Sequence, residues 1–354
     1  MRCPTSLRSV AALLALALSF AWAAPAAAST FSITVEFDGG LTSGEEAVFS
    51  QAAAYWNHVI TGYKSGIRGM HGVDIDASGE YIDGVGGILG STALPGVDFK
   101  TASNGVQYTL ATGTSMIFDS DDLDNMYSQG YLYPVIVHEM AHAIGFGTLW
   151  DVNNLYPTSS GQYTGAAGLA AYRAEFVGQQ NAAYVPVELG GGAGTAGGHW
   201  NEVDGGAGPT GIVDKQGRDM EYELMTGWLN LPAASEFISQ TTIHSFEDLG
   251  YTVLAGDANY DGTINGADLN IVLANYNKTG MDWAHGDFNG DGTVDGTDLN
   301  SLLANYNQNT GLYGTFGPSG GSSLTLAVPE PGTLSALVLG VVSVLAWAAR
   351  RKRR

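Results

Sequence analysis

Residues 133–150 of the chain have the sequence YPVIVHEMAHAIGFGTLW, and this stretch decides the fold of the domain around it. A proline near its start and Gly145 towards its end predict one helix between them. His138 and His142 are four residues apart, so they lie on one face of such a helix with their Cβ atoms about 5–6 Å apart. Two imidazoles at this spacing can share one tetrahedral Zn²⁺. Glu139 lies beside that metal, where it can take a proton from zinc-bound water, and the stretch therefore predicts one catalytic Zn²⁺ with Glu139 as general base.

A third zinc ligand is expected elsewhere in the chain, because catalytic zinc sites usually have three protein ligands and one open position. The remaining histidines are the candidates: His58, His71, His199, His244 and His285. His199 is favoured, because it follows a run of glycines that lets the backbone approach a metal closely. His244 is the second choice, although it lies on a helix predicted over residues 235–249, where a helix-surface position is its expected role. His58 is expected to be a packing residue.

The sequence around the zinc motif predicts an α+β fold, with mixed strands and helices. Residues 31–37 alternate apolar and polar side chains, which predicts a half-buried strand, and residues 73–77 predict another strand. Residues 85–94 are interrupted by glycines and predict an edge strand with a bulge. Residues 45–60 have helical spacing. The residues at helical spacing in this last helix, expected to pack, are Ala47, Val48, Gln51, Ala54, Tyr55, His58 and Val59.

An internal repeat follows this domain. Residues 257–268, DANYDGTINGAD, recur thirty residues later as DFNGDGTVDGTD at residues 287–298. Both copies place oxygen-bearing side chains at loop positions 1, 3, 5, 9 and 12, a glycine at position 6 and a backbone carbonyl at position 7, as a Ca²⁺ loop requires. We therefore predict two structural Ca²⁺ ions. Their ligands are Asp257, Asn259, Asp261, Thr263, Asn265 and Asp268 in the first loop, and Asp287, Asn289, Asp291, Thr293, Asp295 and Asp298 in the second.

The two ends of the chain predict targeting segments. Residues 1–28 combine Arg2 and Arg8 with an apolar run and an alanine-rich end, which predicts a signal peptide removed on export. Residues 328–354 combine the start VPEP with a 17-residue apolar run and an arginine-rich end, just long enough to span a bilayer. Between them we expect the catalytic domain at 29–253, the calcium repeat pair at 254–309 and a Gly/Ser/Thr linker at 310–327.

Charge and cysteine content exclude several classes of function. Outside residues 1–28 and 350–354 the chain has 7 basic residues against 35 acidic ones, a formal charge of −28. A surface of this sign repels the phosphates of nucleic acids and anionic membranes, so no nucleic-acid partner is expected. The single cysteine, Cys3, lies in the predicted signal peptide, which excludes disulfides and a thiol nucleophile from the exported protein.

The catalytic domain resembles the leishmanolysin-type branch of the metzincin metallopeptidases. The resemblance lies in residues 138–150 and in three later motifs: GHW at 198–200, ELMTG at 223–227 and FEDLGY at 246–251. It implies a metzincin-like zinc peptidase fold, zinc-dependent endopeptidase activity, His199 as the third ligand after a long insertion, and Met225 as the Met-turn residue beneath the zinc. The sequence departs from many related enzymes at Thr148, where those enzymes have their third histidine, and in lacking a cysteine that could enforce latency.

The two C-terminal segments resemble known modules as well. The repeat pair closely resembles a type I dockerin domain, which implies a small all-α calcium-binding domain and a cohesin module on a scaffold protein as partner. A calcium-stapled spacer without a partner is the alternative. Residues 328–354 resemble a PEP-CTERM sorting signal, which implies a bacterial envelope protein whose tail is cut by an exosortase. A permanent transmembrane anchor is the alternative.

Together these features predict an exported zinc metalloendopeptidase, secreted or attached to the cell surface, that hydrolyses a protein or peptide substrate. One alternative is a catalytically inactive surface-binding protein attached through its dockerin-like module. Another is a hydrolase that acts on a non-peptide substrate at the same zinc. The intact set of His138, Glu139 and His142 favours the enzyme. No tyrosine closely follows Met225, so the sequence identifies no oxyanion-stabilising residue.

Overall fold

The structure, a computed structural model, describes residues 30–310 except residues 87, 193, 204–205 and 231–234, and also residues 325–327. The predicted signal peptide and sorting tail lie outside the described residues. Among the helices that the structure describes, none combines the length and the apolar character that a membrane crossing requires. The elements, in chain order, are β1 (Ile33–Gly39), α1 (Ser43–Val59), β2 (Ile60–Tyr63), β3 (Val73–Glu80), β4 (Gly90–Thr101), β5 (Gln107–Asp119), α2 (Ser120–Gln129), α3 (Leu132–Ile144), β6 (Gln162–Tyr163), α4 (Ala166–Glu175), β7 (Val185–Pro186), η1 (Met220–Tyr222), β8 (Trp228–Asn230), α5 (Gln240–Asp248), β9 (Tyr251–Val253), α6 (Gly266–Asn275), η3 (Trp283–His285), α7 (Gly296–Ala304) and β10 (Thr325–Ala327).

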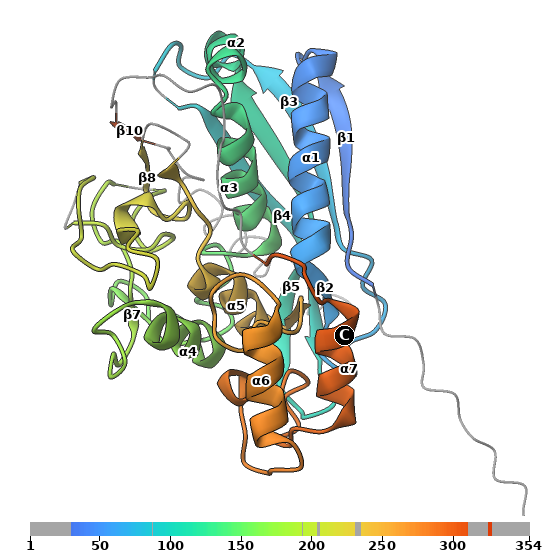
Figure 1. Ribbon diagram of the computed structural model, residues 1–354. Helices are drawn as coiled ribbons and strands as arrows, with labels where there is room; N and C mark the ends of the chain where they lie inside the picture. The colour runs from blue at the N-terminus through green and yellow to red at the C-terminus, as the bar shows by residue number, and fades with distance from the viewer. Residues whose placement is uncertain are drawn as a thin grey trace, which may run out of the picture.

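The residues before 254 are called the larger unit. It contains a four-stranded mixed sheet with the strand order β1-β3-β5-β4. β1 runs parallel to β3 and β3 runs parallel to β5, whereas β4 lies antiparallel to β5 at one edge. Parallel neighbours need a crossover connection, and α1 lies within the connection from β1 to β3. α1 and α3 pack side by side on the sheet (Figure 1). This arrangement confirms the predicted mixture of strands and helices.

The predicted strands over residues 31–37 and 73–77 are present as β1 and β3. The edge strand predicted over residues 85–94 is present as β4, with register irregularities between Ala93 and Val97, but it begins later than expected. The preceding residues form a loop instead, in which the backbone N–H of Gly86 donates to Oδ1 of Asp122 at 3.0 Å and that of Ile88 donates to Oδ1 of Asp83 at 2.9 Å. The edge position and the irregularity were therefore predicted correctly, and the boundary was not.

α1 was predicted correctly as a helix, but its buried face was not. The structure buries Phe49, Ala52, Ala53 and Trp56 in place of most of the residues expected, and of the expected set only Val59 is buried. The two faces are one residue apart, which is a rotation of about 100° around the helix axis. The reason is the size of the aromatic side chains, because burying Phe49 and Trp56 removes more apolar surface from water than burying Val48 and Ala54.

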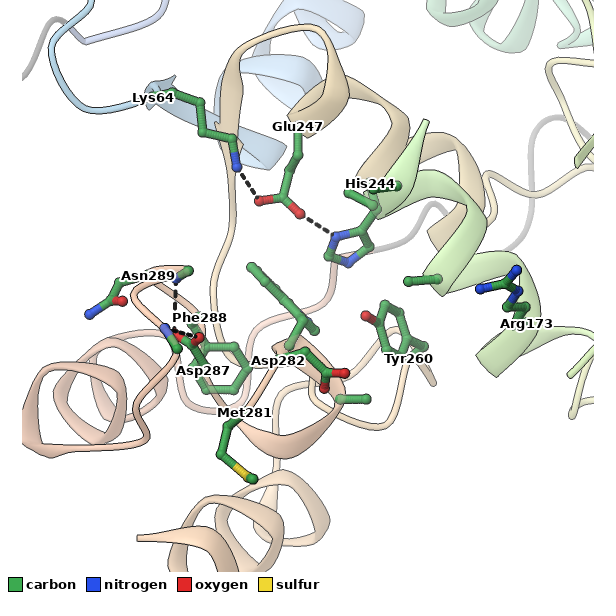
Figure 2. A pocket seen from close by; sticks show the side chains of 17 residues that line it. Lys64, Arg173, His244, Glu247, Tyr260, Met281, Asp282, Asp287, Phe288 and Asn289 are labelled. Atoms are coloured by element: carbon green, nitrogen blue, oxygen red, sulfur yellow. Dashed lines mark hydrogen bonds and ion pairs between the residues drawn. The ribbon is translucent and has the colours of Figure 1, made fainter. Parts of the chain in front are cut away.

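The helix predicted over residues 235–249 is present as the shorter α5. His244 was expected on its surface, but only 2% of the residue is exposed. Its ring centroid lies 4.6 Å from that of Trp283 and 5.0 Å from that of Tyr260, and its Nδ1 lies 2.8 Å from Oε2 of Glu247 (Figure 2). The prediction was wrong because the sequence of one helix does not show which neighbouring unit covers its outer face.

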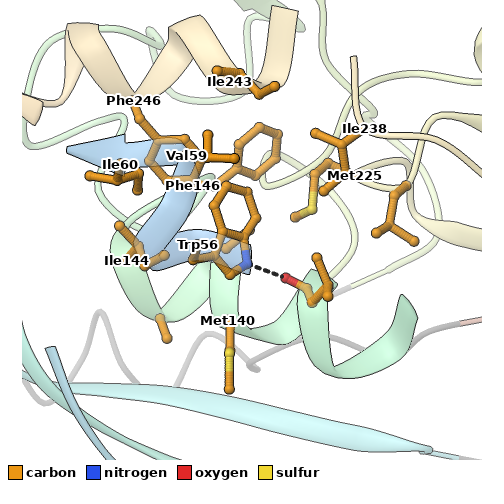
Figure 3. Close-up of a cluster of buried hydrophobic side chains, with 14 of the residues drawn as sticks. Trp56, Val59, Ile60, Met140, Ile144, Phe146, Met225, Ile238, Ile243 and Phe246 are labelled. Atoms are coloured by element: carbon orange, nitrogen blue, oxygen red, sulfur yellow. Dashed lines mark hydrogen bonds between the residues drawn. The ribbon is translucent and has the colours of Figure 1, made fainter. Parts of the chain in front are cut away.

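Trp56 joins α1 to the helices that follow it. Its Nε1 donates to the carbonyl oxygen of Val137 in α3 at 3.0 Å, and its ring packs edge-on against Phe246 of α5 with the centroids 5.1 Å apart (Figure 3). α3 ends at Gly145, as predicted, with a φ of +126° that residues other than glycine rarely adopt. These contacts fix the position of α3, and hence of the zinc motif, within the larger unit.

Residues 254–310 form a second unit that contains α6 and α7. Its own small core comprises Leu254, Ala258, Ile264, Val272, Phe288, Val294 and Leu302. Each helix begins with the same capping box, made by Asn265 and Asp268 in α6 and by Asp295 and Asp298 in α7. The repeat in the sequence is therefore a repeat in structure. β10, within the segment predicted as a linker, pairs antiparallel with β8.

Candidate metal centre

Three histidines from two distant segments converge in the larger unit. His138 and His142 come from α3, and His199 comes from the loop that follows β7. The Nε2 atoms of His138 and His142 lie 3.0 Å apart, those of His142 and His199 lie 3.1 Å apart, and those of His138 and His199 lie 3.3 Å apart. All three residues are at most 1% exposed. The structure thus brings together the three residues that the sequence analysis selected as zinc ligands, in a group that could hold a metal ion.

The other ring nitrogen of each histidine faces a backbone carbonyl. The Nδ1 atoms of His138, His142 and His199 lie 2.6, 2.8 and 2.9 Å from the carbonyl oxygens of Leu224, Phe146 and Thr195, respectively. Because a carbonyl oxygen can only accept, each Nδ1 carries a proton, and in the neutral ring each Nε2 then presents a lone pair. Three lone pairs directed at one point repel one another unless a cation lies between them. Hydrogen bonds of this kind are typical of histidines that bind a metal.

The spacing of the three nitrogens fits a zinc ion. A tetrahedral Zn²⁺ with Zn–N distances of 2.0–2.1 Å separates its ligand nitrogens by about 3.3–3.4 Å. The observed separations of 3.0, 3.1 and 3.3 Å are close to this value. Three neutral imidazoles that leave a fourth position open are also the donor set of one class of catalytic zinc sites.

Glu139 is fully buried next to the two histidines of α3. Its Oε2 accepts a hydrogen bond from Oγ1 of Thr92 at 2.6 Å, and the same hydroxyl lies 3.3 Å from the carbonyl oxygen of Glu139. Thr92 belongs to β4, so the edge of the sheet orients the carboxylate. No feature of the sequence pointed to Thr92, because the two residues are 47 positions apart and a single threonine in a strand carries no motif.

The turn that contains Met225 lies against the histidine cluster. The carbonyl oxygen of Leu224 faces His138, and the carbonyl oxygen of Met225 accepts from the backbone N–H of Trp200 at 3.0 Å, next to His199. The Met225 side chain is buried and points into the cluster of apolar side chains that includes Ile238 (Figure 3). The role of Met225 as a Met-turn residue stays a prediction, but the backbone of its turn touches both segments that supply histidines.

Two buried glutamates that the sequence analysis did not single out hold this turn. Glu223 accepts hydrogen bonds from the backbone N–H of Met225 and from Oγ1 of Thr242, both at 2.6 Å. Glu202 accepts from Oγ1 of Thr226 at 2.6 Å. Burial raises the pKa of Glu223, and burial raises the pKa of Glu202 to about 7. Glu223 is the first residue of the ELMTG motif, but Thr242 lies 19 positions from Glu223 and Thr226 lies 24 positions from Glu202, so the sequence does not show these side-chain bonds.

A cavity of about 430 Å³ opens beside His142. Its lining includes Thr148, Asp151, Tyr156, Leu189 and several glycines between residues 194 and 198. Thr148, which stands where related enzymes have their third histidine, donates from Oγ1 to the carbonyl oxygen of His142 at 2.8 Å. The histidine cluster can therefore be approached from this side, although the three histidines themselves are buried.

The other four histidines lie outside the cluster. His58 is exposed, and its Nε2 lies 3.2 Å from the carbonyl oxygen of Asn309, so its expected role as a packing residue was wrong. The rotation of α1 that buries Trp56 turns His58 outwards. His71 and His285 are also exposed, and His244 belongs to the contact with Trp283. None of these four is therefore a third ligand in this structure.

The two predicted calcium loops have the same internal hydrogen bonds. The equivalent bonds are Gly262 N to Asp257 Oδ2 and Gly292 N to Asp287 Oδ2, both 2.7 Å, and Ala258 N to Asp268 Oδ1 and Phe288 N to Asp298 Oδ1, both 2.9 Å. Asp257 and Asp268 are buried. Burial and the neighbouring charge of Asp268 raise the pKa of Asp257 to about 7. Carboxylates crowded in this way are suited to a divalent cation, which offsets their repulsion.

Comparison with known protein families identifies the second unit. The model of the dockerin type I domain matches residues 255–306. No curated protein matches the chain. The chain thus contains a type I dockerin domain, and domains of this type bind calcium. The likeness of the larger unit to metzincins and that of the tail to a sorting signal find no support in the comparisons and stay predictions.

Proposed function

We propose that the larger unit is a zinc-dependent endopeptidase of metzincin type, secreted or attached to the cell surface. One observation carries the proposal. The Nδ1 atoms of His138, His142 and His199 are all bound to backbone carbonyls, so in the neutral rings three Nε2 lone pairs meet at one point, and Glu139, the residue after His138, is fully buried. Such an arrangement suits a metal with a neighbouring proton acceptor better than it suits packing.

In this proposal the three histidines hold one Zn²⁺, which would supply Lewis acidity and an acidified water when bound. Glu139 takes a proton from the attacking water and delivers it to the leaving amine. Thr92 is a positioning residue, because its hydroxyl fixes one oxygen of the Glu139 carboxylate. The cavity beside His142 offers one side from which a peptide can reach these groups.

The dockerin domain supports the second part of the proposal, two structural Ca²⁺ ions and a cohesin-type scaffold partner. Leu273 of α6 and Tyr276 just after it occupy positions equivalent to Leu303 of α7 and Tyr306 just after it, and all four side chains are exposed. Exposed apolar pairs repeated on two helices suit a protein partner. Export by the signal peptide and exosortase-type cutting of residues 328–354 complete the proposal, and both rest on the sequence.

Incubation of the protein with unfolded casein tests the enzymatic part. We expect cleavage by protein that carries one equivalent of zinc, loss of cleavage after zinc is removed, and recovery when zinc is added back. Protein that binds zinc but leaves casein and a diverse peptide library intact would instead favour the catalytically inactive surface-binding protein or the hydrolase of a non-peptide substrate. Undiminished cleavage by zinc-free protein would exclude the proposed mechanism.

A further inference from the structure

The larger unit contacts the first calcium loop directly. Nζ of Lys215 donates to the carbonyl oxygen of Asn259 at 3.1 Å, and Nε2 of Gln216 donates to the carbonyl oxygen of Asp261 at 3.4 Å. Asn259 and Asp261 stand at positions 3 and 5 of the loop, where both side chains are predicted Ca²⁺ ligands. The contact therefore depends on the same backbone that calcium would order.

A buried hydrogen-bond path leads from this loop into the larger unit. Oγ1 of Thr310 donates to Oδ2 of Asp257, at position 1 of the loop, at 3.3 Å, and Nε2 of Gln240 donates to the hydroxyl of Thr310 at 2.9 Å. Gln240 is fully buried at the start of α5. Two residues further on, Thr242 donates to Glu223, the glutamate that holds the turn beside the histidine cluster. α5 thus connects the loop with that turn.

The second calcium loop faces the larger unit across a cavity. A cavity of about 570 Å³ lies between them, with Lys64 and Arg173 on one side and Asp287 and Asn289 of the second loop on the other (Figure 2). Trp283 packs edge-on against His244 of α5, but its Nε1 donates at 2.7 Å to the carbonyl oxygen of Asp257, which again belongs to the first loop. The two loops have the same internal hydrogen bonds, but they differ in the residues outside the loop that they contact.

We infer that the first calcium loop and α5 form one interaction surface, so that Ca²⁺ bound in this loop stabilises α5 and the turn beside the histidine cluster. Without calcium, the crowded carboxylates of Asp257, Asp261 and Asp268 repel one another and loosen the loop. The loosened loop no longer presents Asp257 to Thr310 or its carbonyls to the larger unit. Calcium that binds the ordered loop therefore stabilises the docked arrangement by linkage. The inference does not depend on the proposed peptidase activity.

Hydrogen exchange of the α5 amides, residues 240–248, tests this inference. The full-length protein is used zinc-free, so that a chelator acts on calcium alone, and the β5 amides provide an internal reference for an intact fold. Asp261→Asn and Asp291→Asn remove the same carboxylate from position 5 of the first and second loops. We expect calcium to slow α5 exchange about tenfold in the wild type and in Asp291→Asn, but not in Asp261→Asn. Equal α5 exchange with and without calcium in the wild type, or an equal loss in both variants, would overturn the inference.

A second variant leaves the calcium ligands untouched. Gln240→Met removes the donor to Thr310 while keeping the length of the side chain, and it should reduce the calcium response of α5 without changing calcium binding to the second loop. An unchanged response in this variant would exclude the Gln240–Thr310 contact as the coupling element.

Discussion

Nδ1 of His138 lies 2.6 Å from the carbonyl oxygen of Leu224, a residue 86 positions later in the chain. The bond fixes the ring orientation of the first histidine of α3 by means of a turn that Glu223 holds in place. Because the orientation of a ligand determines the direction of its lone pair, the metal centre depends on the fold of both halves of the larger unit. The site needs the two histidines of α3, and the turn at Leu224 fixes the orientation of the first of them.

Replacing His199 tests whether the three nitrogens act as one site. We expect His199→Ala to weaken zinc binding more than about 100-fold, because two imidazoles and water replace a three-nitrogen set. Proteolysis should be lost together with the metal. Metal content after dialysis, measured by atomic emission, and casein cleavage report the two effects.

His71→Ala is the matched control, because His71 is exposed and lies outside the cluster. It should retain one zinc per chain. Full zinc content in His199→Ala would move the third ligand elsewhere.

Glu139 is expected to act on the proton and not on the metal. Glu139→Gln should therefore retain zinc while kcat falls about 10³–10⁴-fold, the upper range for a general acid–base group. Substantial proteolysis by Glu139→Gln would refute its role as the base.

Thr92→Val isolates the positioning contact, because valine has nearly the same shape and lacks the donor to Oε2 of Glu139. We expect kcat to fall about tenfold with zinc content unchanged, as for other residues that orient an active-site group through one hydrogen bond. Thr92→Ser restores a hydroxyl and should recover most of the rate. A serine variant as slow as the valine variant would assign Thr92 a packing role.

The sequence predicted those features whose signal is local. The helix α3 and its end at Gly145 follow from helical spacing and from glycine, and the duplicated calcium loops follow from oxygen-bearing residues at fixed intervals. His199 is farther from the motif, and its selection required the glycine run and a family resemblance as well. The structure places His199 next to His138 and His142, as the glycine run and the resemblance suggested.

The remaining features depend on contacts between distant segments. The face of α1 was misplaced by one residue because spacing alone did not weigh Trp56 against its neighbours, and the burial of His244 depends on Trp283 of the other unit. Only the fold brings Thr92 to Glu139 and Thr242 to Glu223. The sequence does not show these contacts, although Glu223 itself lies in the ELMTG motif.

Removal of calcium is expected to unfold residues 254–309. The core of this unit is small, and its buried carboxylates, among them Asp257 and Asp268, repel one another without a cation. Far-UV circular dichroism should lose the contribution of α6 and α7 on chelation and regain it with Ca²⁺, whereas Mg²⁺ at the same concentration should restore less. A spectrum that chelation leaves unaltered would mean that the core alone folds this unit.

The ion pair between Lys64 and Glu247 predicts a specific loss of stability in acid. Nζ of Lys64 lies 3.0 Å from Oε1 of Glu247. Burial alone would raise the pKa of Glu247, but the charge of Lys64 and the hydrogen bond from His244 lower it from the ordinary 4.5 to about 2. Because the pKa in the folded state is the lower one, the ionised carboxylate stabilises the fold above pH 4.5. This contribution is lost as the pH falls from 4.5 towards 2.

Lys64→Met removes the cation and keeps the apolar stem. A fully buried pair that loses one partner costs about 3–5 kcal/mol, but 34% of the Lys64 side chain is exposed, so we expect a loss of about 1–2 kcal/mol at pH 7. The difference between the wild type and Lys64→Met in urea unfolding should shrink below pH 4.5, where Glu247 of the variant takes up its proton first. Lys100→Met, which removes a more exposed ion pair with Asp98, should cost less than about 0.5 kcal/mol. Equal losses in the two variants, or a difference that does not change with pH, would show that Glu247 gains no stability from Lys64.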